Sequence, residues 1–452
     1  MAKADRDAVL RARKRVPPPG GALLEDTEKM KQKHHRMLCA FCALVILVST
    51  VFPTAAFAEQ PVDAAPAEQT LTRADAAEMQ QADAAVTVLT ESEQYQEMDT
   101  DARKDAALAQ LDTLAAKGLV EKDSIYTDEE NGMVSFRYPC GVLGGILLTE
   151  PEEETLDEEN AETETASNAL PLRLPPDLGA EMQKSRAALL RRTENQAVEK
   201  FGTAVIYYAF DNTINSSRFP YYAYMQGFWS ALGLETKINI HVTVADLKKM
   251  GNYNVSVLSA HGSYYTYSYG KFLKRTRTEP IMLLTEESTF GKDLRYGFDL
   301  LAHRVIKVNG MYCVTSDFFR NAYKGGKLSN TIVYSETCEF LGVDGSEDNA
   351  MADALLSGGA QAVIGYVNNV YTVYSRSMLW DTINHLIMGQ NVGQALEHAK
   401  ATYGEDDLIW YHAQGGRRPH AAASYAVLYG NSQAALHVPE SNRSMFSADL
   451  AA

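Results

Sequence analysis

Two segments about 75 residues apart each carry an apolar, β-prone run up to a side chain that can do chemistry. The run at residues 255–260 leads directly to His261 and Gly262, and the run at residues 331–335 leads to Cys338. Short apolar runs bounded by turn formers predict buried strands of a parallel sheet. Reactive groups in open α/β sheets gather beyond the carboxyl ends of the strands. We therefore expect His261 and Cys338 at one sheet edge, where an imidazole can assist a thiolate nucleophile.

Gly262 belongs to the same predicted site. Glycine lets the main chain turn sharply, and its N–H can face a developing oxyanion with no side chain in the way. A lone histidine at a strand end, or a lone buried cysteine, is more commonly structural than catalytic. The prediction of a nucleophilic site therefore depends on the two residues occurring as a pair.

Strand and helix patterns alternate from about residue 200 onward. Repeated βα units predict an α/β fold, a mostly parallel sheet with helices on both faces. The predicted strands are residues 204–208, 237–242, 255–260, 312–314, 332–335, 361–366 and 424–429. The predicted helices are residues 221–232, 245–250, 316–323, 349–357, 372–388 and 392–403. Residues 263–310 are rich in tyrosine and show no clear period, so we expect an irregular insertion or a binding loop there.

The 452 residues leave room for more than one domain. An acidic N-terminal region with helices over 59–120 and a hairpin over 132–148 predicts an α+β accessory domain or a pro-region. The following acidic run has little to bury and predicts a linker open to proteolysis. The predicted divisions are a signal or anchor at 1–58, the acidic region at 59–149, the linker at 150–180, the α/β domain at 181–440 and a tail at 441–452.

The N-terminus has the pattern of an export signal. Basic residues up to Arg36 precede an apolar stretch at residues 37–57, which ends on Ala56-Phe57-Ala58. This order predicts a secretory signal cleaved after Ala58. The stretch is nearly long enough to span a bilayer, so a retained anchor is the alternative. Both interpretations place the rest of the chain outside the cytosol, with the membrane contacted only through this segment.

Charge and cysteine content narrow the function classes. The net charge is −16, and residues 59–166 carry 27 acidic against 6 basic side chains. This acidity argues against nucleic acid as a partner, because phosphate binding needs a basic face. Cys140, Cys313 and Cys338 remain outside the signal segment and form no disulfide framework or zinc pattern. We expect Cys313 to be a buried apolar residue, and we expect neither a cofactor nor a metal.

The order of several motifs resembles the caspase–gingipain–clostripain superfamily of cysteine peptidases (clan CD). Its members have an apolar block ending in His-Gly and a later block ending in Cys, as at His261-Gly262 and Cys338. Downstream segments of this chain are similar to the helix, glycine-alanine turn and strand that follow the cysteine in gingipain-like and CHAT-type members. The similar segments are residues 350–356, 358–365, 389–396 and 425–431. The resemblance covers roughly residues 200–437.

The resemblance implies a caspase-like fold and hydrolysis of peptide bonds through a thioester. By position, Cys338 is the nucleophile and His261 the general base and acid. The backbone N–H groups of Gly262 and Cys338 would hold the oxyanion. A protein or peptide is then the expected partner.

Two carboxylates are candidates for substrate binding. Glu336 lies two residues before Cys338, where clostripain-like members carry an acidic residue near the pocket for the P1 side chain. A carboxylate there would attract Arg or Lys at P1. Alternatively, Glu336 pairs with a nearby cation or lies exposed. Asp344 is a weaker candidate for the same role, as is Asp348.

These features predict an exported cysteine endopeptidase, made as a zymogen and cutting after basic residues. The alternative, from another class, is a caspase-like surface protein that binds but no longer cuts. A sortase-like transpeptidase is disfavoured, because sortases are all-β barrels and this chain alternates strands with helices. The tyrosines at 264, 265, 267 and 269 either line a substrate cleft or pack inside the protein.

Overall fold

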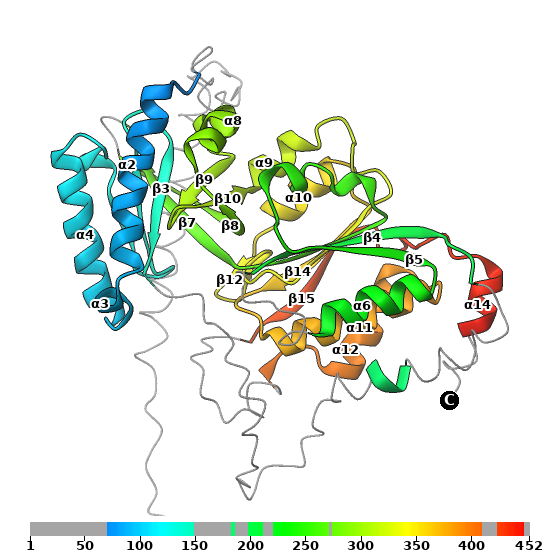
Figure 1. The fold of residues 1–452 in the computed structure, drawn as a ribbon. Coiled ribbons are helices and arrows are strands. Elements are labelled where there is room, and N and C mark those ends of the chain that lie inside the picture. The colour runs from blue at the N-terminus through cyan, green and yellow to red at the C-terminus, as the bar shows by residue number, and fades with distance from the viewer. Residues whose placement is uncertain are drawn as a thin grey trace, which may run out of the picture. The chain divides into compact units, whose positions relative to one another are not determined.

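The computed structural model describes residues 70–148, 182–185, 198–210, 220–270, 274–408 and 423–446. All of these residues belong to one compact unit, which contains two sheets (Figure 1). The protein is a mixed α/β structure, as expected from the alternation of strand and helix patterns. The predicted signal or anchor at 1–58 and the predicted linker at 150–180 lie outside the described residues.

A six-stranded, largely parallel sheet forms the centre of the C-terminal part. Its order is β15-β14-β11-β6-β4-β5, and only β15 runs antiparallel to its neighbour. The strands are β4 (Gly202–Ala209), β5 (Leu234–Asn239), β6 (Val255–Ala260), β11 (Ile332–Ser335), β14 (Ala362–Val367) and β15 (Tyr425–Gly430). The predicted strands are therefore present, although β5 begins three residues earlier than expected.

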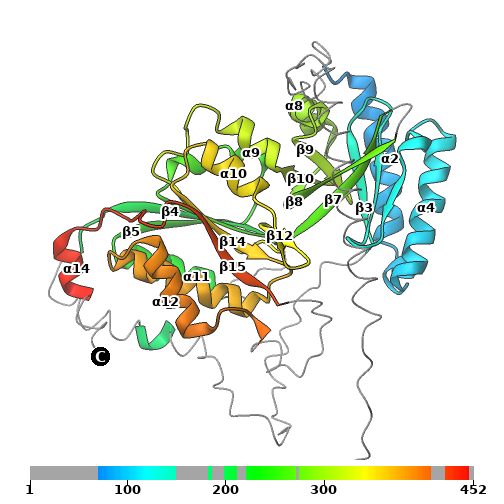
Figure 2. The same cartoon turned by 180° about the vertical axis from the view of Figure 1, so that it is seen from behind.

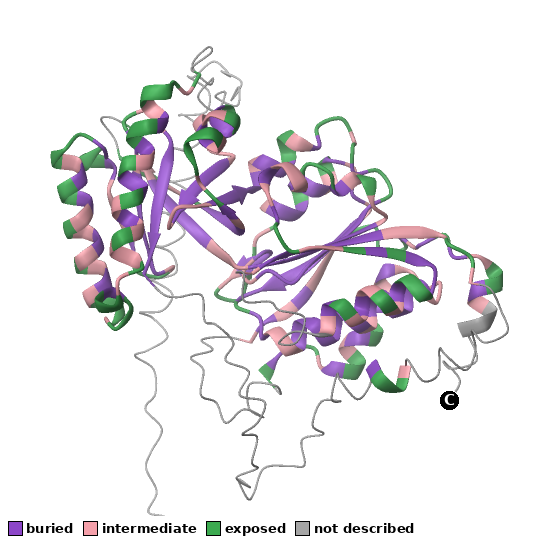
Figure 3. Cartoon of the chain, in the orientation of Figure 1, coloured by how far each residue is buried: buried purple, intermediate pink, exposed green. Residues whose placement is uncertain are grey.

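Helices cover both faces of this sheet, as Figures 1 and 2 show. Alternate residues of one strand point to opposite faces, so Ala204 and Ile206 pack in one core while Val205 and Tyr207 pack in the other. One face carries α6 (Pro220–Ala231), α11 (Thr372–Ile387) and α12 (Val392–Tyr403). The other carries α7 (Val244–Leu247), α9 (Ser316–Ala322) and α10 (Ala350–Ser357). Covering both faces explains why β6, β11 and β14 are rich in apolar residues and buried along their whole length (Figure 3).

A second sheet of seven strands joins distant parts of the chain. Its order is β1-β2-β3-β9-β10-β8-β7. The strands are β1 (Tyr126–Asp128), β2 (Met133–Arg137), β3 (Leu143–Leu147), β7 (Gly262–Tyr269), β8 (Arg275–Glu287), β9 (Val305–Val308) and β10 (Met311–Thr315). The hairpin predicted at 132–148 is β2 and β3. Because β3 pairs in parallel with β9, strands that precede the predicted linker and strands that follow it belong to the same sheet.

The helices of the acidic region are packed elements. They are α2 (Arg73–Thr90), α3 (Glu93–Gln96) and α4 (Thr100–Ala116). Thr72 caps α2 through a reciprocal pair of hydrogen bonds with Asp75, and Asp99 caps α4. Met79 and Leu111 belong to the hydrophobic core under the sheet. These helices therefore bury one face each, although their sequences are rich in acidic residues.

Residues 263–310 were expected to be irregular, and this expectation was wrong. They form β7, β8, α8 (Phe290–Leu301) and β9. Alternation along β7 buries Tyr265 and Tyr267 in the core between β3, β8 and β9. Tyr264 is buried as well, whereas Tyr269 at the strand end is 37% exposed. Three of the four tyrosines therefore pack inside the protein. The tyrosine-rich sequence of β7 reflects a strand whose side chains are buried on both faces.

A buried charge cluster fastens α2 to this sheet. Lys307 on β9 has no solvent-exposed side-chain surface and pairs with Asp83 of α2 and with Asp293 of α8, the latter at 2.9 Å. Tyr312 donates a hydrogen bond of 2.7 Å to Asp293, and Tyr138 donates one to Asp83. The two carboxylates therefore pair with the buried ammonium group, and each carboxylate also accepts a hydrogen bond from a tyrosine hydroxyl.

No helix among the described residues is long and apolar enough to cross a membrane. The predicted export segment at residues 37–57 is not among them. The predicted tail at 441–452 overlaps α14 (Glu440–Phe446), which is helical up to Phe446.

Candidate active site

His261 and Cys338 follow neighbouring strands of the central sheet. Strands β6 and β11 are parallel, with Leu258 opposite Ser335, and the N–H of Glu336 donates a 2.7 Å hydrogen bond to the carbonyl of Leu258. His261 and Cys338 each stand three residues beyond the Leu258–Ser335 pair. The two residues therefore leave the sheet at the same edge and at the same level.

The main chains of the two segments touch at Gly262. A Cβ atom at this position would overlap the carbonyl oxygen of Cys338 and lie 2.5 Å from Cγ2 of Thr337. Such distances are shorter than any van der Waals contact. The close approach of the Cys338 backbone therefore requires glycine at position 262. This steric reason adds to the sharp turn and the accessible N–H expected from the sequence.

The N–H of Gly262 points away from the sheet that Gly262 begins. In the β7–β8 pairing Gly262 stands opposite Met282, and Leu283 N–H donates a 2.9 Å hydrogen bond to the carbonyl of His261. Hydrogen-bonded and non-hydrogen-bonded residue pairs alternate along an antiparallel ladder. Because His261 and Leu283 are hydrogen-bonded, the next pair, Gly262 and Met282, is a non-hydrogen-bonded one. The Gly262 amide is therefore left out of this ladder.

Residues at the ends of four adjacent strands surround the pair. Phe210, after β4, packs edge-on against His261 with ring centroids 4.6 Å apart. Val370, after β14, places its carbonyl oxygen 3.8 Å from the Cys338 sulfur. Both His261 and Cys338 are half-buried. A half-exposed thiol beside an imidazole-bearing segment is the environment in which reactive cysteines occur.

The other two described cysteines differ from Cys338. Cys313 is fully buried in β10, as expected, and burial raises the pKa of its thiol far above the usual range. Cys140 is half-buried at a turn, and burial also raises the pKa of its thiol. Cys338 differs from both in following a strand of the parallel sheet next to the strand that leads to His261.

Glu336 lies inside the protein. It is 4% exposed, and its carboxylate accepts hydrogen bonds from the Tyr222 hydroxyl at 2.9 Å and the Ser375 hydroxyl at 3.4 Å. Burial raises the pKa of Glu336 to about 7, although the positive charge of Arg376 opposes the rise. These contacts hold Glu336 between α6 and α11, and its burial contradicts the alternative that it lies exposed.

Acidic groups lie on the other side of Cys338. Glu339 follows the cysteine directly with a φ of 53°, and its N–H donates a 2.9 Å hydrogen bond to the carbonyl of Asn368. Burial, and then the charge of Asp344, raises the pKa of Glu339 to about 7. Asp344 is exposed in the turn between β12 (Gly342–Val343) and β13 (Ser346–Glu347). Glu339 was not among the predicted site residues, although it is the acidic residue that directly follows Cys338 in the sequence.

The segment after Cys338 is tied to its surroundings by side chains. Asp348 accepts a 3.1 Å hydrogen bond from Tyr264 of β7, and Glu347 accepts one of 2.6 Å from Tyr429 of β15. The N–H of Gly345 donates to the side chain of Asn368 at 2.9 Å. Asp348 and Glu347 are therefore engaged in holding the loop, and Asp344 is a further exposed carboxylate of this segment.

Comparisons with known proteins add no further constraint. No protein-family model matches the chain, and no curated protein matches its sequence. Any assignment of function depends on the geometry of the strand ends.

Proposed function

We propose that this protein is a cysteine endopeptidase with a caspase-like fold, exported from the cytosol by its N-terminal segment. One observation supports the proposal above all others. His261-Gly262 and Cys338 follow adjacent parallel strands at the same level, and the backbones of Gly262 and Cys338 are in contact. This matches the order and spacing on which the resemblance to clan CD peptidases was based.

The proposed reaction begins with attack of the Cys338 thiolate on the scissile carbonyl carbon. A cysteine thiol has an ordinary pKa of about 8.5, so a histidine that accepts its proton increases the thiolate fraction at neutral pH. The N–H groups of Gly262 and Cys338 stabilise the oxyanion. His261 then gives its proton to the leaving amine, and a thioester with Cys338 remains. Water, deprotonated by His261, hydrolyses the thioester and restores the thiol.

We expect a basic side chain at P1. Glu339 follows Cys338 directly in the chain, and Asp344 acts on Glu339 through its charge, so these two carboxyl groups would attract Arg or Lys. Glu336 contributes less, because its carboxyl is buried and hydrogen-bonded to Tyr222.

A scan of fluorogenic peptides that differ only at P1 tests both parts of the proposal. We expect wild-type protein to cleave Arg and Lys substrates best, and kcat/KM to fall at least about a thousandfold in Cys338→Ala and His261→Ala. Cys140→Ala is the matched control, since this half-buried thiol lies outside the site. Cleavage that survives Cys338→Ala defeats the peptidase assignment, whereas equal cleavage after acidic P1 residues defeats only the proposed preference.

Thiol labelling separates the peptidase from the non-cutting alternative. A functional site predicts that iodoacetamide modifies Cys338 faster than Cys140 in the folded protein, and that His261→Ala removes the difference. Equal rates, together with no cleavage of any peptide, would favour the caspase-like binding protein.

A further inference from the structure

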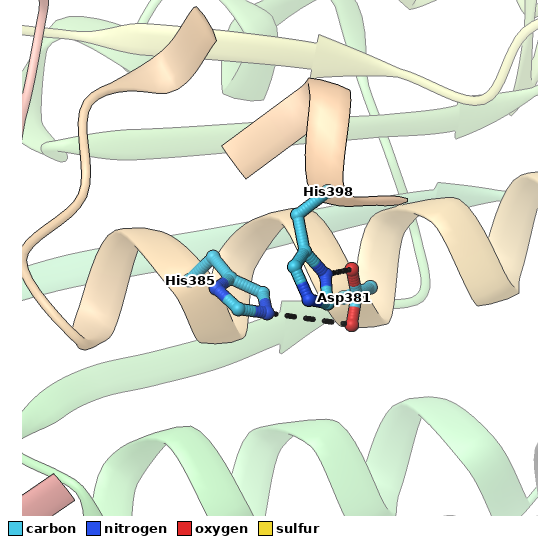
Figure 4. Close-up of side chains that lie close together, drawn as sticks. All are labelled: Asp381, His385 and His398. Atoms are coloured by element: carbon cyan, nitrogen blue, oxygen red, sulfur yellow. Dashed lines mark hydrogen bonds and ion pairs between the residues drawn. The ribbon is translucent and has the colours of Figure 1, made fainter. Parts of the chain in front are cut away.

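Three side chains able to bind a metal converge between α11 and α12. Asp381 and His385 are four residues apart on α11, so they lie on the same face of that helix. His398 reaches them from α12, which packs alongside α11. Figure 4 shows the carboxylate of Asp381 pointing toward both imidazole rings.

The distances suit a metal ion. Oδ1 of Asp381 lies 3.8 Å from Nε2 of His385, and Oδ2 of Asp381 lies 2.7 Å from Nδ1 of His398. One ligand atom from each residue can be chosen so that all lie within 4.8 Å of one another. Ligand atoms about 2.0–2.1 Å from a tetrahedral Zn²⁺ ion are about 3.4 Å apart. The ring centroids of His385 and His398 are 3.7 Å apart with an angle of 34° between the planes, so rotation of the imidazole side chains is needed to place an ion among the three atoms.

The three side chains of the cluster differ in their exposure to solvent. The side chain of His385 is 5% exposed, that of Asp381 is 15% exposed and that of His398 is 45% exposed. The buried ligands are held by the packing of the two helices, and the exposed one leaves a path for an ion from solvent. The same opening leaves room for water to complete the coordination shell.

We propose that Asp381, His385 and His398 bind a divalent transition-metal ion, with Zn²⁺ as the preferred ion. Two imidazole nitrogens and one carboxylate oxygen form a donor set typical of zinc, whereas Ca²⁺ and Mg²⁺ prefer sites made of oxygen alone. The ion replaces the hydrogen bond between Asp381 and His398 and joins α11 to α12. The N-terminal turn of α11 carries Ser375, which contacts Glu336, so the ion would brace the helix pair that supports the strand end at Cys338.

Calorimetric titration of the full chain with ZnCl₂ tests this proposal. Thiolates also bind zinc, so the parent protein carries Cys39→Ser, Cys42→Ser and Cys338→Ala and has no affinity tag. We expect one saturable equivalent of Zn²⁺, a rise in unfolding temperature on its addition, and no binding of Ca²⁺.

Two variants and a control decide the outcome. Asp381→Asn and His398→Ala should bind Zn²⁺ about tenfold more weakly or worse, while His437→Ala, which removes an exposed histidine elsewhere, should bind like the parent. His398 is partly exposed, so its replacement should leave the fold intact, and circular dichroism checks this. Parent-like affinity in both variants, or no saturable binding by the parent, overturns the proposal.

Discussion

At the scale of single residues, the backbone of one segment limits the size of the side chain that the neighbouring segment can carry at the candidate site. Gly262 lies against the carbonyl of Cys338, and its own φ is not in the left-handed region. The requirement for glycine thus comes from a segment 76 positions away in the chain. The placement of His261 and Cys338 after neighbouring strands was predictable, because each follows a mostly apolar strand and parallel strands end at one edge.

Substitution of Gly262 tests this close approach. We expect Gly262→Ala to push the backbone at Cys338 out of position, to destabilise the protein by about 1–3 kcal/mol and to slow labelling of Cys338. Urea denaturation measures the first effect and iodoacetamide kinetics the second. Gly227→Ala is the control, because nothing lies within 4 Å of an added Cβ on this exposed helical position. It should stabilise the protein by about 0.5–1 kcal/mol, and a similar gain at Gly262 would contradict the described contact.

The burial of Glu336 was not predictable from its position beside the cysteine. Its hydrogen-bond partners come from α6 and α11, which lie on either side of it in the chain. A local sequence pattern holds no information about which helices cover a given strand face. The same holds for Glu339, whose pKa depends on Asp344 in a turn that folds back beside it.

Glu336 should make stability depend on pH. Burial raises its pKa from an ordinary 4.5 to about 7. Between these pH values the folded chain keeps a proton that the unfolded chain has released, so this residue's contribution to the unfolding free energy falls as pH rises and then levels off. Glu336→Gln removes the effect. Its stability relative to wild type should therefore improve by up to about 3 kcal/mol from pH 4.5 to pH 8.

Urea denaturation across this pH range checks the prediction. Glu279→Gln serves as a parallel case away from Cys338, because burial raises the pKa of Glu279 to about 7 as well. A stability difference between Glu336→Gln and wild type that stays constant with pH would show that Glu336 ionises normally in the folded protein.

At the scale of elements, the six-stranded sheet could be predicted from the sequence because its strands are short apolar runs between helices. The β7–β8 hairpin could not. Its strands carry tyrosine, threonine and charged residues on both faces, and β8 alternates only weakly. These residues are buried by β3, β9 and β10, which belong to other parts of the chain. Tertiary contacts therefore override a weak local signal.

Removal of the buried ammonium group should weaken the attachment of α2 to the seven-stranded sheet. We expect Lys307→Met to cost about 3–5 kcal/mol, because Asp83 and Asp293 are left without a counter-charge. Equilibrium unfolding measures the loss. Lys249→Met, which breaks an exposed pair with Asp246, should cost less than about 1 kcal/mol. Adding Asp83→Asn and Asp293→Asn to Lys307→Met should recover part of the stability, and no recovery would argue against a charge effect.

At the scale of the whole molecule, the acidic region and the proposed peptidase are joined by hydrogen-bonded strands. Residues 126–147 and 262–315 contribute to the same sheet. If residues 59–149 act as a pro-region, processing of the linker would leave them in place. Activation would then depend on conformational changes near the cleavage site in the linker and would not require dissociation of residues 59–149. The role as a pro-region stays a prediction from the charge pattern.

Cleavage at a protease site inserted between Glu158 and Glu159 tests this attachment. We expect the two fragments to elute together in size-exclusion chromatography and to separate only in denaturant, because the β3–β9 pairing and the Lys307 cluster connect them. Denaturing electrophoresis of the eluted peak confirms the cut. Fragments that separate in native buffer would contradict the shared sheet.

The pairing of β3 with β9 also has a consequence for how the chain acquires its structure. The residues joined by this ladder, such as Gly144 and Lys307, are far apart in sequence, and contacts of such high sequence separation slow folding. During synthesis the hairpin of β2 and β3 emerges long before its partner strand is available. An edge of that hairpin stays uncovered over this interval, and an unpaired strand edge favours association with other chains or with chaperones.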